Sequence, residues 1–187
     1  MAIMGLVIVD LDGTLFDTRE VNYRAYSEAI RPYGYSIEYD YYCEYCNGRH
    51  YLDFLPQITT SDKDILLDIH DRKKKEYQHF LGYARLNEGL VRILNSLKSG
   101  NSIALVTTAS KGNTYDILTR FDLVNLFDLI LTQEDIEKPK PDPEGFVKAM
   151  KHFSAEPKDC IIFEDSEVGI QAAEKTGATV FVAKGYN

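Results

Sequence analysis

The sequence predicts an α/β fold, with a parallel sheet covered by helices and a helical insertion after the first strand. Five short apolar runs are rich in Leu and β-branched residues and lack strict alternation. Strands that are buried on both faces of a parallel sheet have this composition. The runs are Leu6–Val9, Ile103–Val106, Leu129–Leu131, Cys160–Phe163 and Thr179–Ala183.

Amphipathic helical stretches separate the later runs, at Asn113–Phe121, Pro143–His152 and Glu167–Lys175. Strands that alternate with helices along the chain are typical of an α/β fold in which helices pack on both faces of the sheet.

The interval after the first run is different, because it has no convincing buried strand before about position 85. Its helical patterns are Val21–Ile30, Tyr51–Leu55 and Asp62–Phe80. A plain crossover needs only about a dozen residues. We therefore expect a helical domain at 16–84, inserted into a core formed by 1–15 and 85–187.

Composition narrows the class of protein. The 187 residues have a net charge of −8 and a pI near 5.0, which argues against a nucleic-acid partner because such proteins need excess Lys and Arg. The sequence has neither a signal-peptide pattern nor an apolar stretch near the roughly 18 residues of a membrane span. Three cysteines, an odd number, argue against a disulfide framework. A cytoplasmic protein without a membrane partner is expected.

Three features of the insertion allow two interpretations each. Cys43 and Cys46 are either half of a zinc or redox motif or two reduced packed cysteines, and the missing second ligand pair favours packing. The tyrosines between Tyr33 and Tyr51 form either a substrate-facing wall or, as we favour, packing in a small helical unit. The basic run Arg72–Lys75 is predicted to be a solvated helix face rather than a phosphate site.

Two carboxylates end the first strand, at Asp10 and Asp12. The carboxyl ends of strands are where open α/β sheets bind ligands. Like charges at this spacing favour a hard cation such as Mg²⁺ between them, and Gly13 lets the backbone turn sharply beside an anion. An Asx-turn would explain Asp12 but not Asp10.

The segment DLDGTLFDT resembles the first motif of the haloacid dehalogenase-like hydrolase superfamily, and three later segments match in order. IALVTTAS resembles the second motif, with Thr107. EKPKPDPEGF resembles the third, with Lys138. IIFEDSEVGIQAAEKTGA resembles the fourth, with Glu164 and Asp165. The four motifs extend over Leu6–Ala183. The resemblance implies a Rossmann-like core with the Asp10 strand in the centre and a small α-helical cap.

The resemblance also implies roles. Asp10 would attack the phosphoryl group and form an aspartyl-phosphate, and Asp12 would be the general acid and base. Thr107 would hydrogen-bond a phosphoryl oxygen, and Lys138 would offset charge in the transition state.

A Mg²⁺ cofactor would be held by Asp10, the backbone carbonyl of Asp12, and Glu164 and Asp165. No other cofactor is expected. Within the second motif, Thr108 could replace Thr107, and Thr108 and Ala109 are also candidate substrate contacts. Lys140, which also precedes a proline, is the alternative to Lys138.

The insertion resembles the small helical cap of the subgroup of β-phosphoglucomutases and phosphoglycolate phosphatases. By that resemblance Gly48, Arg49 and His50 are candidates for binding the non-reacting part of the substrate. Two positions depart from the mutases, which have a His where this chain has Asn22 and an Arg where it has Tyr51.

We therefore predict a Mg²⁺-dependent phosphatase that hydrolyses a small phosphate monoester, such as a sugar phosphate or similar metabolite. The alternatives are a phosphohexomutase of the β-phosphoglucomutase type and a catalytically silent phosphate-binding module. Asp12 argues against dehalogenation, because the dehalogenases of the superfamily lack the second aspartate. The expected assembly is a monomer or a small homo-oligomer.

Overall fold

The computed structural model describes residues 5–183, and these form two compact units. The core unit comprises 5–17 and 85–183, and the helical unit comprises 18–84. The sequence places the first boundary two residues earlier, at position 16.

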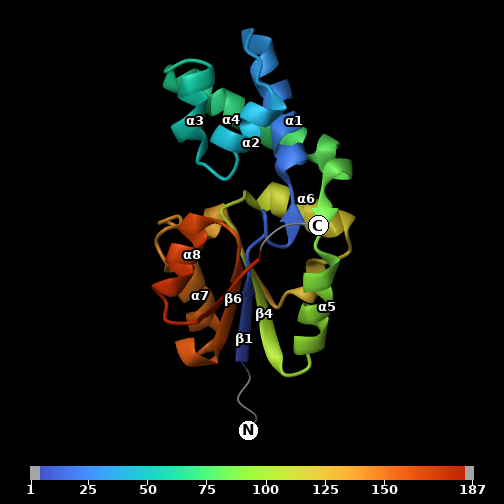
Figure 1. Ribbon diagram of the computed structural model, residues 1–187, viewed down its shortest axis with the longest axis vertical. Coiled ribbons are helices and arrows are strands. Elements are labelled where there is room, and N and C mark those ends of the chain that lie inside the picture. The colour runs from blue at the N-terminus through green and yellow to red at the C-terminus, as the bar shows by residue number, and fades with distance from the viewer. Residues whose placement is uncertain (1–4, 184–187) are drawn as a thin grey trace. The chain divides into compact units, whose positions relative to one another are not determined.

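The core unit is built on a five-stranded parallel sheet with the strand order β5-β4-β1-β6-β7 (Figure 1). Asp10 follows β1, which lies in the middle of the sheet, so the predicted α/β fold with a parallel sheet is confirmed. The strands are β1 (Gly5–Val9), β4 (Asn101–Val106), β5 (Leu129–Leu131), β6 (Cys160–Glu164) and β7 (Thr179–Val182).

Helices cover both faces of this sheet, and this is why its central strands are apolar throughout. One face packs Leu6 and Ile8 against α7 (Glu144–Phe153) and α8 (Glu167–Glu174). Figure 1 shows α5 (Glu88–Leu97) on the opposite face.

Over its described residues, the core unit also contains one further helix, three 3₁₀ turns and a two-stranded ribbon. They are α6 (Lys111–Arg120), the 3₁₀ turns η3 (Val124–Leu126), η4 (Gln133–Asp135) and η5 (Pro157–Asp159), and a small antiparallel ribbon of β2 (Phe16–Asp17) and β3 (Arg85–Leu86). The ribbon stands where the chain leaves the core unit and returns to it. An ion pair of 3.1 Å between Arg85 and Asp17 joins its two strands.

The helical unit has its own apolar core. Its elements are α1 (Arg19–Ile30), η1 (Arg31–Tyr33), α2 (Tyr39–Tyr45), α3 (Tyr51–Ile58), α4 (Lys63–Tyr77) and η2 (Gln78–Tyr83). Tyr26 and Tyr42 are buried in this core with Phe54, whereas Tyr39 and Tyr41 are exposed. The tyrosines therefore contribute both packing and surface.

Cysteine and lysine placement refines two expectations for the helical unit. Cys43 and Cys46 are free thiols, and Cys46 is buried. The basic run is not wholly a solvated face, because Lys73 is buried and its Nζ lies 5.3 Å from the ring centroid of Tyr26 and 4.9 Å from that of Tyr77. The rings of Tyr26, in α1, and of Tyr77, one turn later in α4, stabilise this charge.

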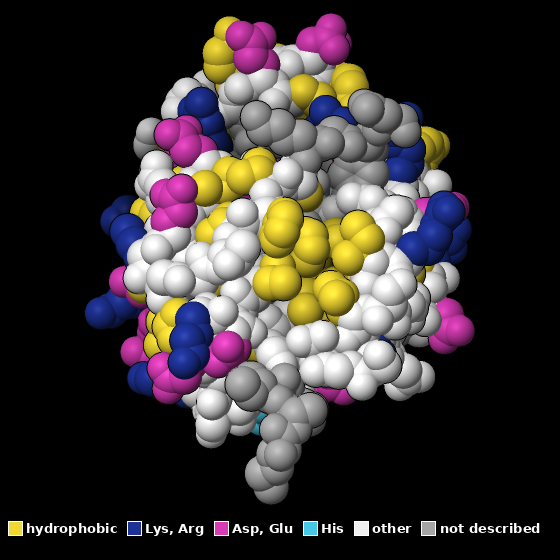
Figure 2. All heavy atoms as spheres, turned by 60° about the horizontal axis from the view of Figure 1, so that its bottom comes forward, with side chains coloured by type: hydrophobic (Ala, Val, Ile, Leu, Met, Phe, Trp, Pro, Cys, Tyr) yellow, Lys and Arg dark blue, Asp and Glu magenta, His cyan; other side chains and the backbone are white. Residues whose placement is uncertain are grey.

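The surface shows charges of both signs. Figure 2 presents one face, on which basic and acidic side chains are interspersed rather than gathered into a basic area. Within 5–183, no helix is both long and apolar enough to cross a membrane.

Candidate active site

Asp10 lies directly beyond β1, and its side chain is buried. Its backbone N–H donates to the carbonyl oxygen of Phe163 at 3.0 Å, which extends the pairing of β1 with β6. The residue is 5% exposed. The centre of the sheet thus fixes the position of this carboxylate.

A tight turn after Asp10 leaves room for the carboxylate of Asp165. Gly13 has a φ of +88°, and its N–H donates to the carbonyl oxygen of Phe16 at 2.7 Å. A Cβ on Gly13 would lie 2.0 Å from a carboxylate oxygen of Asp165. The Thr14 hydroxyl donates to Asp165 at 2.8 Å. Glycine is therefore required here both by the backbone conformation and by the approach of Asp165.

Glu164 ends β6 with its carboxylate fully enclosed, at 1% exposure. One oxygen accepts the backbone N–H groups of Asp165 at 2.6 Å and Ser166 at 2.7 Å. A Cβ on Gly169 would lie 1.7 Å from the other oxygen. The glycine in the first turn of α8 leaves the space that this carboxylate occupies.

Lys140, not Lys138, reaches these carboxylates, so the predicted choice between the two lysines is corrected. The Nζ of Lys140 donates to Asp10 at 2.5 Å and to Glu164 at 2.6 Å. It also lies 5.2 Å from the ring centroid of Phe146. Lys138 is exposed.

The start of α7 explains why Lys138 lies outside the cluster. The carboxylate of Glu144 accepts the backbone N–H of Glu137 at 3.0 Å and that of Lys138 at 2.8 Å. These bonds hold the 137–138 backbone against the first turn of α7, and Lys140, two residues later, is the lysine directed to Asp10. The sequence signal for this arrangement is Lys140-Pro141-x-Pro-Glu144, in which the acidic residue opens α7.

Burial and mutual repulsion shape the charges of the cluster. Burial raises the pKa of Asp10 well above its usual range, opposed by Lys140 and reinforced by Glu164. Burial also raises the pKa of Asp165 to about 6, although the hydrogen bond from Thr14 opposes this. Burial acts to lower the pKa of Lys140, but the two adjacent carboxylates outweigh it and raise the pKa.

The carboxylates suit a hard cation. Asp10, Glu164 and Asp165 each offer an oxygen, and these oxygens lie within 4.8 Å of one another. The ammonium of Lys140 bonds only two of these three carboxylates, and a bound cation would favour the charged form of all three. Mg²⁺ prefers oxygen ligands, carboxylates among them. The residues present therefore fit a divalent cation.

The second motif places a hydroxyl at the same edge of the sheet. Thr107 is buried directly after β4, and its Oγ1 accepts the N–H of Ala109 at 3.0 Å. Thr108 is exposed. Ser110 caps α6 through the N–H of Asn113 at 3.5 Å. Of the two threonines, Thr107 has the strand-end position expected of a phosphate contact.

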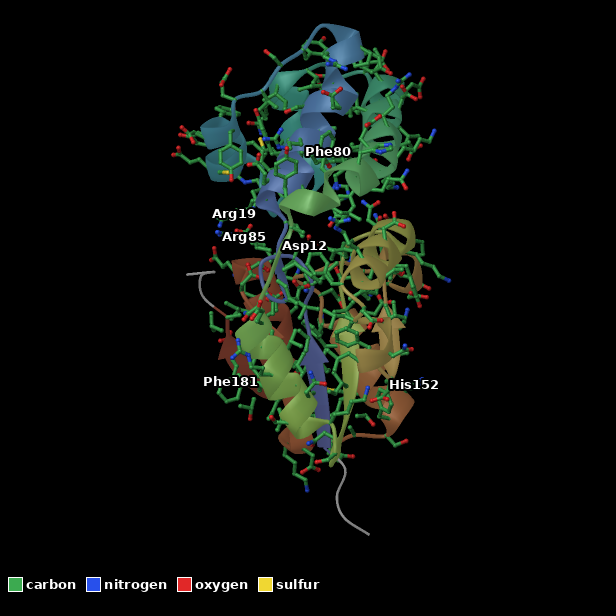
Figure 3. All side chains as sticks on the ribbon, turned by 90° about the vertical axis from the view of Figure 1, so that its right-hand side faces the viewer. Asp12, Arg19, Phe80, Arg85, His152 and Phe181 are labelled. Atoms are coloured by element: carbon green, nitrogen blue, oxygen red, sulfur yellow. The ribbon has the colours of Figure 1, made fainter. Side chains whose placement is uncertain are left out.

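Figure 3 shows Asp12 just beyond the carboxyl end of β1, partly exposed. His152, near the C-terminal end of α7, lies far from Asp12 in the same core unit.

The candidate substrate residues Gly48, Arg49 and His50 belong to the helical unit. Gly48 has a φ of +75°, and all three are exposed. Asn22, in α1, donates to the Thr18 hydroxyl at 3.2 Å.

Comparison with known proteins agrees with this geometry. Residues 7–183 match the family described as haloacid dehalogenase-like hydrolase. A phosphorylated carbohydrates phosphatase of Thermotoga maritima is 28% identical over 180 residues, which cover 93% of this chain and 82% of that protein. A β-phosphoglucomutase of Bacillus subtilis is 29% identical, with 93% of this chain and 80% of that protein covered.

A solved structure shares the fold. The crystal structure of CbbY from Rhodobacter sphaeroides in complex with phosphate matches with a TM-score of 0.85 at 23% identity, and the match covers 98% of this chain and 87% of that one.

The sheet, the acidic cluster beyond β1 and the family match define the class of this protein: the chain belongs to the haloacid dehalogenase-like hydrolase family. It is a phosphoric monoester hydrolase of that family.

Proposed function

We propose that this protein is a Mg²⁺-dependent phosphatase that hydrolyses small phosphorylated sugars or similar metabolites through an aspartyl-phosphate on Asp10. The observation that carries the proposal is the ammonium of Lys140 at 2.5 Å from Asp10, in a cluster with two further carboxylates. A carboxylate nucleophile needs its negative charge, and a buried carboxylate keeps that charge only beside cations.

Each residue of the cluster has a separate role in the proposed reaction. Asp10 supplies the attacking oxygen, and Lys140 offsets the charge that builds up on Asp10 and the phosphoryl group. Thr107 donates a hydrogen bond to a phosphoryl oxygen. Asp12 gives a proton to the leaving oxygen and later takes one from the attacking water. The transfer of a proton from the attacking water to Asp12 distinguishes hydrolysis from simple phosphate binding.

Asp10, Glu164 and Asp165 would hold Mg²⁺, with the backbone carbonyl of Asp12 as a further ligand. When bound, the cation supplies positive charge for the phosphoryl oxygens. Because the ammonium of Lys140 already touches two of the three carboxylates, Asp165 is the carboxylate of the cluster most available to a cation.

The substrate class rests on the relatives and on the helical unit. Relatives named for phosphorylated carbohydrates, validoxylamine A 7′-phosphate and fructose 1-phosphate all match more than nine-tenths of this chain. We assign Arg49 and His50 of the cap to the non-reacting part of the substrate, with Gly48, Thr108 and Ala109 as lesser contacts.

The test is a screen of phosphate release over sugar phosphates, phosphoglycolate and nucleotides, with Mg²⁺ and with a chelator. We expect Mg²⁺-dependent release from sugar phosphates. Isomer formation from β-glucose 1-phosphate that outpaces release, in the presence of a bisphosphate primer, would instead identify a mutase. No release from any ester would leave only a binding module.

A further inference from the structure

Two aromatic rings form a stack inside the helical unit, and a third ring lies beside it. The rings of Tyr51 and His70 lie parallel, with centroids 3.9 Å apart and an interplanar angle of 8°. The ring of His50 is tilted by 42° against the Tyr51 ring, with a centroid separation of 4.7 Å. Tyr51 is the first residue of α3 and His70 is in α4, so the stack joins the start of α3 to α4.

The chain before Tyr51 presents side chains to solvent. Residues 47–50 are all exposed. The N–H of Arg49 donates to the carbonyl oxygen of Cys46 at 3.1 Å, and the Nδ1 of His50 accepts the N–H of Leu52 at 3.4 Å. Tyr51 follows this segment directly, and its ring packs on His70 of α4.

His70 contributes the face of its ring rather than its nitrogens. Both ring nitrogens are buried and have no hydrogen-bond partner within 5–183. Burial, together with Lys74, Lys73 and His50, lowers the pKa of His70 to about 3. The ring is therefore neutral at ordinary pH. Burying an imidazole without hydrogen bonds costs free energy. The stacking contact with Tyr51 is the favourable interaction that the ring makes in return.

We propose that His70 is a positioning residue: its ring fixes Tyr51, and Tyr51 holds Arg49 and His50 in the orientation that selects the substrate. The inference rests on the proposed function in so far as it assigns the 47–50 segment to the substrate. A guanidinium and an imidazole held in this way suit a phosphate ester whose non-reacting part carries hydroxyl groups or a second anion.

The first measurement does not depend on activity. Trypsin cleaves after Arg49, and native-state cleavage reports how firmly this segment is held. His70→Leu removes the ring, and His70→Phe restores one. Since an aromatic pair is worth up to about tenfold in an equilibrium, we expect His70→Leu to be cleaved about three- to tenfold faster after Arg49. Wild-type rates are expected for His70→Phe, and cleavage after Lys98 in the core unit should be unchanged in both.

The second measurement separates positioning from a general loss of structure. For His70→Leu, kcat/KM on a sugar phosphate should fall about three- to tenfold through KM. On p-nitrophenyl phosphate, whose non-reacting part offers neither hydroxyl groups nor an anion, it should be unchanged. Tyr51→Leu should reproduce both effects and provides the test if His70→Leu does not fold.

The outcomes are distinct. Unchanged cleavage after Arg49 in both leucine variants overturns the positioning role, as does an equal loss on both substrates. Faster cleavage in a protein that hydrolyses no phosphate ester in any variant supports the positioning of the segment and refutes the proposed function.

Discussion

Lys140→Met is the perturbation that separates the two lysines of the third motif, and Lys138→Met is its matched control. Lys140 is 10% exposed in its side chain and bonds two carboxylates that are 7% and 1% exposed. Methionine keeps an unbranched chain of similar length and removes only the charge and its hydrogen bonds.

The expected magnitude follows from this burial. Removing one partner of a buried ion pair costs about 3–5 kcal/mol, because the remaining charges lose their compensation. Removing a charged group that acts on the transition state costs about 10²–10³ in kcat. Lys138 is exposed, and exposed substitutions change stability by about 0.5 kcal/mol or less.

The assay combines denaturant unfolding without metal and phosphate release at saturating Mg²⁺. We expect Lys140→Met to lose stability and turnover on these scales, while Lys138→Met keeps both. Mg²⁺ should restore part of the lost stability, because a cation replaces the missing ammonium. A Lys140→Met enzyme with more than a tenth of wild-type turnover, or a larger loss in Lys138→Met, would refute the assignment.

Three further predictions concern the glycine of α8, the metal site and His70. Gly169→Ala should lower the free energy of unfolding by about 2 kcal/mol or more, because the new Cβ would displace the buried carboxylate of Glu164. Gly112→Ala is the control: its Cβ would meet nothing within 4 Å, and it should raise the free energy of unfolding by about 0.5–1 kcal/mol. Equal effects of the two substitutions in urea unfolding would contradict the prediction. Mg²⁺ should raise the free energy of unfolding of the wild type by about 2.7 kcal/mol at a hundredfold excess over its Kd, and Asp165→Asn should abolish the rise; a rise that persists in this variant would remove Asp165 from the metal site. The pKa of His70 in the fold is about 3, below its ordinary value of about 6.5, so the unfolded chain takes up a proton at His70 as the pH falls below 6.5 whereas the folded protein does not until the pH approaches 3. The wild type therefore loses stability over this interval, and His70→Phe should lose about 1 kcal/mol less than the wild type between pH 7.5 and 5; parallel pH profiles would contradict that pKa.

The sheet could be predicted from the sequence because its signal is local. Each strand is a short apolar run, and Asp10 and Asp12 stand out as acids at the end of such a run. By contrast, α5 is absent from the helices predicted above, although the apolar pair Leu90 and Leu94 has helical spacing. That signal was available, since residues four apart share one face of a helix.

The errors concern contacts between distant segments. Lys138 and Lys140 both precede a proline, so the following proline alone does not tell which of them faces Asp10. The start of α7 decides, through the bonds that Glu144 makes to the preceding backbone. The burial of Lys73 within a basic run depends in part on such a contact, with Tyr26 of α1, whereas Tyr77 is only four residues away in α4.

Detection of a phosphoryl group on Asp10 by mass spectrometry tests most directly whether Asp10 is the nucleophile. Asp12→Asn should let the aspartyl-phosphate form from a substrate whose leaving group needs no proton, such as p-nitrophenyl phosphate, and should slow its hydrolysis. We expect phosphorylation of the peptide that contains Asp10, and none in a variant that also carries Asp10→Asn. Steady turnover by Asp10→Asn alone, or a phosphoryl group on another residue, would show that Asp10 is not the nucleophile.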